Sequence, residues 1–306
     1  MNKKLLADCT LLLVVFIWGA TFVLVQDAIS FLEPFSFNAV RFMMAFIILY
    51  IWFLARKKQT LGFSKPLLFA GIKMGIWLFI GYAFQTFGLL YTTPAKAGFI
   101  TGLSVVLVPL FSLFVLKQKP HRNAVIGVIF AATGLYVMTA IQTSNVNMGD
   151  ILVFFCTIGF AMHIITTTKY AGTYPALELT LIQILTVGLL STAFSIGTED
   201  FSRMFDVDTF IQPEVLSALI ITSVLATAFA FLAQTYFQSY TSPTRVALIF
   251  AMEPVFAAIT SYLWISERFT AATLAGCIMI FAGMILAELP NKPRKKDTSI
   301  NEKVSA

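Results

Sequence analysis

Charged residues are scarce in this sequence. Asp, Glu, Lys and Arg together make up 12% of the 306 residues, whereas 58% of the residues are hydrophobic. The mean hydropathy is +0.85. A soluble globular domain has a charged fraction of about 25%. The composition therefore excludes an ordinary soluble domain and indicates a polytopic membrane protein.

Cysteine is also scarce, and common catalytic motifs are missing. Cys9, Cys156 and Cys277 fall in apolar stretches, at spacings that suit neither a disulfide framework nor a metal site. The chain has no Gly-x-x-x-x-Gly-Lys-Ser/Thr phosphate loop and no His-Glu-x-x-His pair. We therefore expect no ATP-driven pump, no enzyme activity, no cofactor and no bound metal.

Long apolar runs, by contrast, fill the chain. A membrane-spanning helix needs about 20 mainly apolar residues. Charged and turn-forming residues divide the chain into ten such runs, and none has the alternating pattern of a β-barrel strand. The first run is retained as a helix, because no small-residue cleavage site follows it. The predicted spans are residues 8–28, 36–55, 67–90, 94–116, 122–141, 149–169, 176–197, 214–238, 243–264 and 271–288.

The loop charges predict an orientation. Cytoplasmic loops carry an excess of Lys and Arg. With the N-terminus inside, the inner loops and the 289–306 tail hold most of the cations, whereas acids such as Glu33, Asp150 and Glu199 lie outside. We therefore predict a multi-pass protein of the cytoplasmic membrane with both termini cytoplasmic and a disordered basic tail. This bias explains the net positive charge, so no nucleic-acid partner is implied.

The two halves of the chain share a pattern. A shift of 149 positions matches six pairs without a gap: Gln85 with Gln234, Pro94 with Pro243, Lys96 with Arg245, Gln118 with Glu267, Gly127 with Gly276, and Gly134 with Gly283. We predict a first repeat over residues 1–141 and a second over 142–288. Because each repeat holds five spans, the second must be inverted in the membrane. Inverted repeats are widespread among secondary transporters.

Short motifs in order carry a family resemblance. They are Trp18-Gly19-Ala20-Thr21-Phe22, Arg41-Phe42, Gly88-Leu89-Leu90-Tyr91, Ala95-Lys96-Ala97-Gly98, Met252-Glu253-Pro254-Val255-Phe256 and Ser266-Glu267-Arg268. Over about residues 8–288, the chain resembles the EamA-type members of the drug/metabolite transporter superfamily. Gln118 departs from the pattern, since the family often has Glu at that place.

The resemblance implies an all-α bundle of ten transmembrane helices, built as two inverted five-helix repeats. A central cavity would lie between the halves, lined mainly by the first, third, fourth, sixth, eighth and ninth spans. The fifth and tenth spans would be peripheral. The implied cargo is a small polar or amphipathic metabolite, such as an amino acid.

Glu253 is the main candidate site residue. It lies ten residues past Pro243, and a helix rises 1.5 Å per residue, so it sits about 15 Å into a hydrocarbon core of about 30 Å. An ionisable group at that depth is costly unless it faces protein or water. Glu253 is interpreted as a proton-binding or cation-coordinating group; the alternative is a structural carboxylate that is hydrogen-bonded across helices.

Cations near helix starts form a second group of candidates. Lys96 and Arg245 each follow a Pro by two residues, where a positive charge opposes the helix dipole. One reading is anion attraction or salt bridging at opposite mouths of the cavity, and the other is snorkelling to the interface. For Arg41, a structural ion pair is the favoured reading.

Polar and aromatic side chains within spans complete the set. Gln85 and Gln234 either hold helices together or bind cargo, and His163 either relays protons or packs. Further candidates for the substrate pathway are Trp18, Thr21, Tyr82 and Phe99. Pro109 and Pro254 are predicted to bend their helices as hinges.

These features together predict a secondary active transporter that works by alternating access. Its partners would be a small-molecule substrate and the lipid bilayer, with proton coupling through Glu253 as one hypothesis. A channel, a lipid scramblase and a multidrug efflux carrier are the alternatives. The sequence leaves the oligomeric state open, and a monomer suffices for this architecture.

Overall fold

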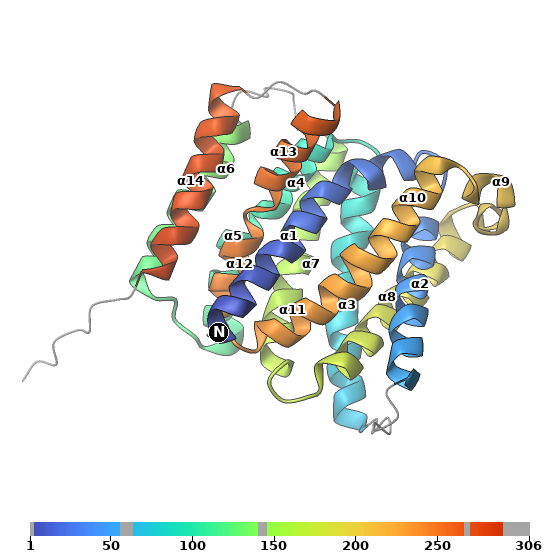
Figure 1. The fold of residues 1–306 in the computed structure, drawn as a ribbon, viewed down its shortest axis with the longest axis horizontal. Helices are drawn as coiled ribbons and strands as arrows, with labels where there is room; N and C mark the ends of the chain where they lie inside the picture. Colours follow the sequence, from blue (N-terminus) through green and yellow to red (C-terminus); the bar gives the residue numbers. More distant parts are fainter. Residues whose placement is uncertain (1–2, 56–63, 140–145, 266–269, 290–306) are drawn as a thin grey trace, which may run out of the picture.

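The computed structural model describes residues 3–55, 64–139, 146–265 and 270–289, and all regular elements in these ranges are helical (Figure 1). The first half holds α1 (Lys3–Ala28), α2 (Pro34–Ala55), α3 (Lys65–Gly88), α4 (Pro94–Gly102), α5 (Ser104–Phe111), a π-helical turn η1 (Ser112–Leu116) and α6 (Arg122–Thr139). The second half holds α7 (Met148–Tyr170), α8 (Ala176–Thr198), a 3-10 turn η2 (Phe201–Phe205), α9 (Val207–Phe210), α10 (Pro213–Ile221), a π-helical segment η3 (Thr222–Phe229), α11 (Ala230–Gln238), α12 (Pro243–Phe250), α13 (Glu253–Ile265) and α14 (Ala271–Glu288).

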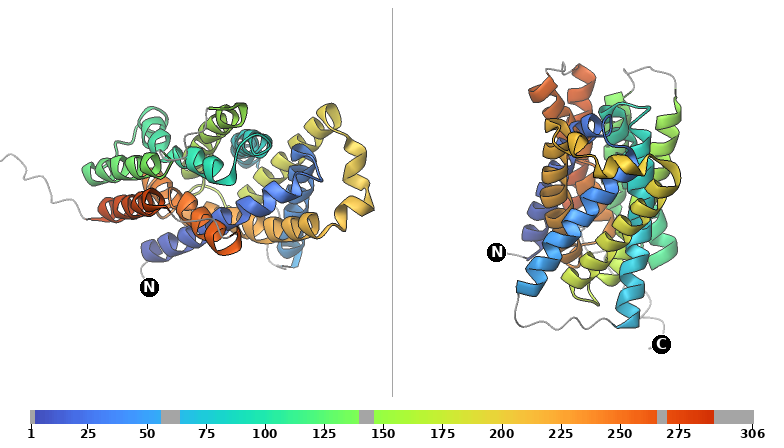
Figure 2. Two further views of the ribbon diagram at one scale, coloured as in Figure 1. Left: turned by 90° about the horizontal axis from the view of Figure 1, so that it is seen from above. Right: turned by 90° about the vertical axis from the view of Figure 1, so that its right-hand side faces the viewer.

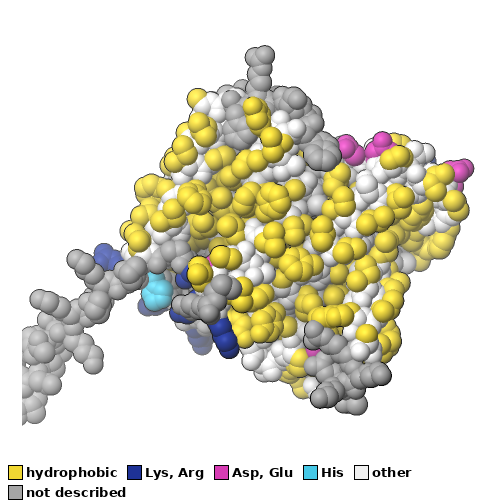
Figure 3. All heavy atoms as spheres, viewed as in Figure 1, with side chains coloured by type: hydrophobic (Ala, Val, Ile, Leu, Met, Phe, Trp, Pro, Cys, Tyr) yellow, Lys and Arg dark blue, Asp and Glu magenta, His cyan; other side chains and the backbone are white. Residues whose placement is uncertain are grey.

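Eight helical stretches among the described residues are long and apolar enough to cross a membrane. They are Lys3–Ala28, Pro34–Ala55, Lys65–Gly88, Lys96–Leu116, Met148–Tyr170, Ala176–Thr198, Pro213–Gln238 and Pro243–Thr260. Two shorter apolar stretches, Arg122–Val137 and Ala271–Ala287, correspond to the fifth and tenth predicted spans. Apolar side chains also cover much of the outer surface (Figure 3). The protein is therefore an α-helical, multi-pass membrane protein.

The helices form two rows when the bundle is seen from above (Figure 2). In one row α3 packs along α7, and in the other α1 packs along α13. The rows meet at both ends, where α6 packs against α14 and α2 packs against α8. The three largest apolar clusters of the described residues each combine side chains from both halves of the chain. The centre between the rows is the place where residues from both repeats can meet.

Two spans are broken near their middle. One breaks at Leu103, between α4 and α5, and the other breaks at Ala251 and Met252, between α12 and α13. The shift of 149 positions carries Leu103 onto Met252, so the breaks are equivalent. Pro254 accounts for the second break, because it is the second residue of α13 and cannot supply a backbone N–H to a preceding turn.

Pro109 is the other proline that is predicted to bend its helix. It lies inside α5, after the break at Leu103 rather than at it. The chain then widens into the π-helical turn η1, a form that accommodates an interrupted hydrogen-bond ladder. The bend in the first repeat thus precedes its proline, so the proline alone does not fix where this helix breaks.

Helix starts are capped in the same way in both repeats. Thr93 accepts a hydrogen bond from the Lys96 amide, and Ser242 accepts one from the Arg245 amide, each at 3.3 Å. A proline follows each cap as the first helical residue, where its missing N–H costs nothing. These matched caps set α4 and α12 at equivalent starting points.

The acidic loop after α8 caps another helix. The two carboxylate oxygens of Glu199 accept from the amides of Phe35 and Ser36, both at 2.7 Å. A negative charge at a helix N-terminus is favourable, because free N–H groups point toward it. Glu199 thereby ties the loop to the start of α2.

Glycines allow α6 and α14 to touch along their backbones. A Cβ atom built on Gly127 would lie 2.5 Å from the Gly283 carbonyl oxygen, and one built on Gly134 would lie 2.7 Å from that of Gly276. Small residues at such positions let membrane helices approach closely. At the shift of 149 positions, Gly127 corresponds to Gly276 and Gly134 to Gly283, so each glycine of α6 contacts the counterpart of the other.

Replacing Gly127 by Val is expected to destabilise the protein by about 1–3 kcal/mol, because the added side chain overpacks this contact. Chemical unfolding of the purified protein in detergent measures the change. Gly197→Ala is the matched control: Gly197 lies in α8 with no atom within 4 Å of an added Cβ. The control is expected to be neutral or slightly stabilising. Equal stability of Gly127→Val and wild type would show that α6 and α14 do not need this close approach.

Candidate functional site

A central pocket lies between the two rows of helices, next to the second break. Its cavity volume is about 60 Å³. The pocket takes residues from both halves of the chain. They are Trp18, Thr21, Phe22, Val25, Arg41, Tyr82, Gln85, Thr86, Leu89, Thr101, Ser104, Phe160, His163, Ile164, Phe231, Gln234, Phe250 and Glu253. No residue of α6 or α14 is among them.

Glu253 opens α13 directly after the helix break. Its side chain lines the pocket and is buried, with 8% of its surface exposed. Within the described ranges the carboxyl group makes no hydrogen bond and no ion pair at 4.0 Å or less. The facing helix approaches closely, since a Cβ on Gly19 would lie 2.6 Å from the Glu253 carbonyl oxygen. The structure therefore offers no structural partner that would explain a carboxyl group here.

Arg41 enters the pocket from α2 and is 3% exposed. Its Nε donates to Thr227 Oγ1 at 2.7 Å, and its Nη2 donates to Tyr82 Oη at 3.3 Å and to the Ala226 carbonyl at 3.4 Å. No carboxylate of the described residues lies within ion-pair distance of its guanidinium group. The structural ion pair predicted for Arg41 is therefore wrong, because the neighbouring helices present hydroxyl, carbonyl and aromatic groups instead.

A π-helical segment shapes the wall beside Arg41. Ala226 belongs to η3, and its carbonyl oxygen accepts from Trp18 Nε1 at 2.8 Å as well as from Arg41. Such segments have an altered hydrogen-bond ladder and are frequent at functional sites. The segment thus orients two pocket residues that come from different helices.

His163 is held by a chain of hydrogen bonds. Its Nε2 lies 2.8 Å from Gln183 Oε1, and Gln183 Nε2 donates to Thr235 Oγ1 at 3.0 Å. Because the amide oxygen of Gln183 accepts, this geometry assigns the proton of the neutral ring to Nε2. His163 thus has a hydrogen-bond partner within the protein and also lines the pocket.

The paired glutamines differ in their bonding. Gln85 Nε2 donates to Thr101 Oγ1 at 3.2 Å, which ties α3 to α4. Gln234 Nε2 donates to Gln238 Oε1 at 3.1 Å, but the Gln234 carbonyl oxygen is buried without a partner. A buried unsatisfied acceptor costs about 1–3 kcal/mol. Gln234 is therefore the glutamine with an acceptor to offer a ligand.

Lys96 and Arg245 lie outside the pocket and form ion pairs. Lys96 Nζ lies 2.9 Å from Asp150 Oδ2, and Arg245 Nε lies 3.0 Å from Asp8 Oδ1. Salt bridging, rather than snorkelling, is thus what the structure shows. Each pair joins a cation of one half to an acid near the first helix start of the other half.

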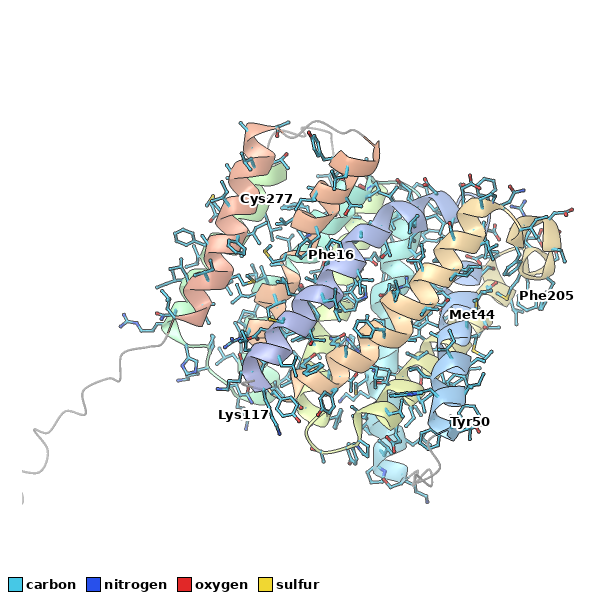
Figure 4. The ribbon with its side chains drawn as sticks, in the orientation of Figure 1. Phe16, Met44, Tyr50, Lys117, Phe205 and Cys277 are labelled. Carbon is cyan, nitrogen blue, oxygen red and sulfur yellow. The ribbon has the colours of Figure 1, made fainter. Side chains whose placement is uncertain are left out.

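The aromatic candidates separate into two groups. Trp18 and Tyr82 line the pocket, as does Thr21 beside them, whereas Phe99 packs against the apolar core next to it. Other aromatic side chains, such as Tyr50 and Phe205, point outward from the bundle (Figure 4). Sequence reasoning missed Phe160 and Phe231, because nothing local distinguishes them among the 31 Phe residues of the chain.

Metal binding has no support in the described part of the chain. No group of three or more His, Cys, Asp or Glu side chains comes together there.

Sequence reasoning also missed Asp8 and Asp150 as a pair, although they are the ion-pair partners of Arg245 and Lys96. Their signal was present. The early spans of the two halves match at a shift of 141 positions, which pairs Ala20 with Ala161 and Pro34 with Pro175, and this shift carries Asp8 to the position before Asp150.

Comparisons with known proteins find similar sequences and a similar fold. The model of the family described as "EamA-like transporter family" matches residues 5–140 and 147–289. A protein of Archaeoglobus fulgidus named "Uncharacterized transporter" is 36% identical over 288 residues, covering 94% of this chain and 87% of the relative. YvbV of Bacillus subtilis, also named an uncharacterized transporter, is 26% identical and covers 99% of both chains. A solved structure titled "Crystal structure of protein" shares the fold, with a TM-score of 0.74, 18% identity and complete coverage of both chains.

Replacing His163 by Leu is expected to destabilise the protein by about 1–3 kcal/mol, because Gln183 Oε1 would lose its donor in a buried place. Replacing it by Gln keeps a donor and is expected to cost less. Unfolding of both variants in detergent measures the difference. If His163→Leu were as stable as His163→Gln, the hydrogen bond to Gln183 would not be what holds this residue.

Proposed function

Since the chain belongs to the EamA-like transporter family, we propose that it is a secondary active transporter. It moves a small polar or amphipathic metabolite, such as an amino acid, across the cytoplasmic membrane by alternating access. The central pocket is the observation that carries the proposal. Polar groups from both halves converge there beside broken helices, the arrangement in which secondary transporters bind their substrates. The relatives named as transporters support the same class.

The proposed architecture is ten spans in two inverted repeats. Three features support it: the breaks at equivalent positions, the matched caps before Lys96 and Arg245, and the reciprocal glycine contacts between α6 and α14. An inverted repeat gives a transporter two similar halves that can exchange conformations.

The pocket walls favour a small amphipathic substrate. Six Trp, Tyr and Phe side chains line the pocket, while Arg41, Glu253 and Gln234 supply localised polar groups. Ligand pockets usually have volumes of about 300–1,000 Å³, whereas this cavity is about 60 Å³. The pocket is therefore contracted in this conformation, and a metabolite binds as the walls move apart.

The two ion pairs are proposed to close opposite ends of the pathway. Lys96 with Asp150 and Arg245 with Asp8 each link the two halves. In alternating access, only one end opens at a time, so one pair breaks while the other holds. Both pairs are formed in this conformation, as expected when the pocket is contracted.

The proposed orientation places both termini in the cytoplasm. Lys117, from a predicted inner loop, lies at the end of the bundle that holds the start of α1 (Figure 4). Acidic side chains gather at the opposite, upper edge of the view (Figure 3). This separation of charge follows the positive-inside rule.

Counterflow in liposomes tests the transport function. Purified protein is reconstituted, the vesicles are loaded with one unlabelled compound, and uptake of its labelled form is followed. Pools of amino acids, nucleosides, sugars and organic cations form the screen. A secondary transporter gives saturable, substrate-specific accumulation. Flux that never saturates would instead indicate a channel or a scramblase.

Replacing Glu253 by Gln is expected to abolish uptake driven by a pH gradient while counterflow persists, because Gln cannot bind or release the coupling proton. Glu178→Gln is the matched control, since Glu178 is similarly buried at 7% exposure but does not line the pocket. Both rates are measured in the same liposomes. Full gradient-driven uptake by Glu253→Gln would exclude proton coupling through this residue and leave exchange or facilitated diffusion.

Replacing Asp150 by Asn is expected to favour the state open at that end, because it breaks the ion pair with Lys96. A change of about 1 kcal/mol alters the population about fivefold. The readout is alkylation of the buried Cys156 in a background with Cys9→Ser and Cys277→Ser. Reaction with N-ethylmaleimide is expected to be about fivefold faster.

The charge swap, Lys96→Asp with Asp150→Lys, is expected to restore the slow rate. Asp200→Asn, which removes an exposed ion pair with Arg203, serves as the control. An unchanged alkylation rate in Asp150→Asn would argue against a closing role for this pair.

A further inference from the structure

Arg41 carries a buried positive charge without a negative partner. Its side chain is 3% exposed, and no carboxylate of the described residues lies within 4.0 Å of it. Removing an ion from water costs several kcal/mol unless an opposite charge or hydrogen bonds compensate it. A guanidinium group on the wall of a pocket, with no carboxylate partner among the described residues, therefore needs an explanation in terms of what the pocket binds.

The contacts that Arg41 does make are neutral. They are the Thr227 hydroxyl, the Tyr82 hydroxyl, the Ala226 carbonyl and the faces of two rings, with the guanidinium carbon 4.8 Å from the Tyr82 ring centroid and 5.5 Å from that of Phe42. These contacts use Nε and Nη2. They leave Nη1 without a hydrogen bond, so they fix the plane of the group while one edge stays available.

Glu253 does not neutralise this charge directly. It is the acid among the residues that line the pocket, yet it forms no ion pair with Arg41. The pocket thus holds an unpaired cation and an unpaired carboxyl group at separate places, together with the unpartnered carbonyl oxygen of Gln234. Three polar groups that lack protein partners are what a site built for a polar ligand leaves open.

We propose that Arg41 is the anion-binding group of the central pocket and that the substrate carries a carboxylate. The planar fork of a guanidinium group matches a carboxylate with paired N–H donors. A carboxylate carries one negative charge, which the single pocket cation balances, whereas a phosphate carries nearly two at neutral pH. The apolar part of the substrate packs against Trp18, Tyr82 and Phe231. These rings line the pocket and contact one another through Phe231, and the guanidinium group lies over the Tyr82 ring.

This inference rests on the proposed function, because it identifies the chemistry of the same pocket. It concerns binding and not movement, so a binding experiment can fail or succeed separately from counterflow. Three probes with the same apolar body test it: 3-phenylpropionate, phenyl phosphate and 3-phenylpropylamine. Each is added to purified protein in a neutral detergent, and thermal unfolding is followed over a range of concentrations.

The wild type is expected to be stabilised by 3-phenylpropionate, and more strongly than by phenyl phosphate. Arg41→Gln is expected to weaken 3-phenylpropionate binding about 10- to 100-fold, in line with the loss of a charge-assisted contact. Arg41→Lys, which keeps the charge but not the fork, is expected to lie between the two. Arg203→Gln, on an exposed turn, is the control and is expected to bind as the wild type does.

Thr227→Val provides a second test of the proposal in case the Arg41 variants fail to fold. It removes the Nε acceptor and leaves the charge, so a modest loss of 3-phenylpropionate affinity with unchanged 3-phenylpropylamine binding is expected. Equal affinity of wild type and Arg41→Gln for 3-phenylpropionate would overturn the proposal. So would a wild type that only 3-phenylpropylamine stabilises. A preference for phenyl phosphate would overturn the assignment to a carboxylate.

Discussion

The cost of a polar group in hydrocarbon is the constraint on which the rest of this structure depends. Water is absent from the bilayer core, so backbone and side-chain polar groups there must find partners inside the protein. The bundle meets this demand in part by bringing several buried polar side chains together at the central pocket, while many large apolar side chains lie on the outer surface. The helix breaks at Leu103 and at Ala251 and Met252 lie at this centre, where irregular backbone is shielded from lipid.

The two halves use the same devices at equivalent places. A Thr or Ser cap, a proline and a cation start each broken helix, and an aspartate from the opposite half binds each cation. The halves differ just after the break, where the first has Ser104 and the second has Glu253. Similar halves give a framework with two comparable end states, and this difference makes the pocket chemically asymmetric.

The same two helices connect the ion pairs to the pocket. α4 and α12 carry Lys96 and Arg245 at their starts and lead into the breaks beside the pocket. In the proposed mechanism, a change at either ion pair would reach the pocket through a single short helix. The contracted cavity and the two formed pairs fit one conformation, in which neither end is released. Arg41 and Glu253 would then be the groups that a substrate meets when one end opens.

The sequence by itself determined the membrane class, the helices and the family resemblance, because these depend on local hydrophobicity, spacing and short motifs. It also selected Trp18, Tyr82, Gln85, Gln234 and Glu253, which the tertiary structure brings together at one pocket. Only the tertiary structure decided which face of each helix points toward the pocket. It placed Arg41 in the pocket with no carboxylate partner among the described residues, and it placed Phe99 against the apolar core outside the pocket. It also paired Lys96 and Arg245 with aspartates that are distant in the sequence. Those outcomes depend on how helices far apart in the chain rotate and pack, which no local pattern of residues specifies.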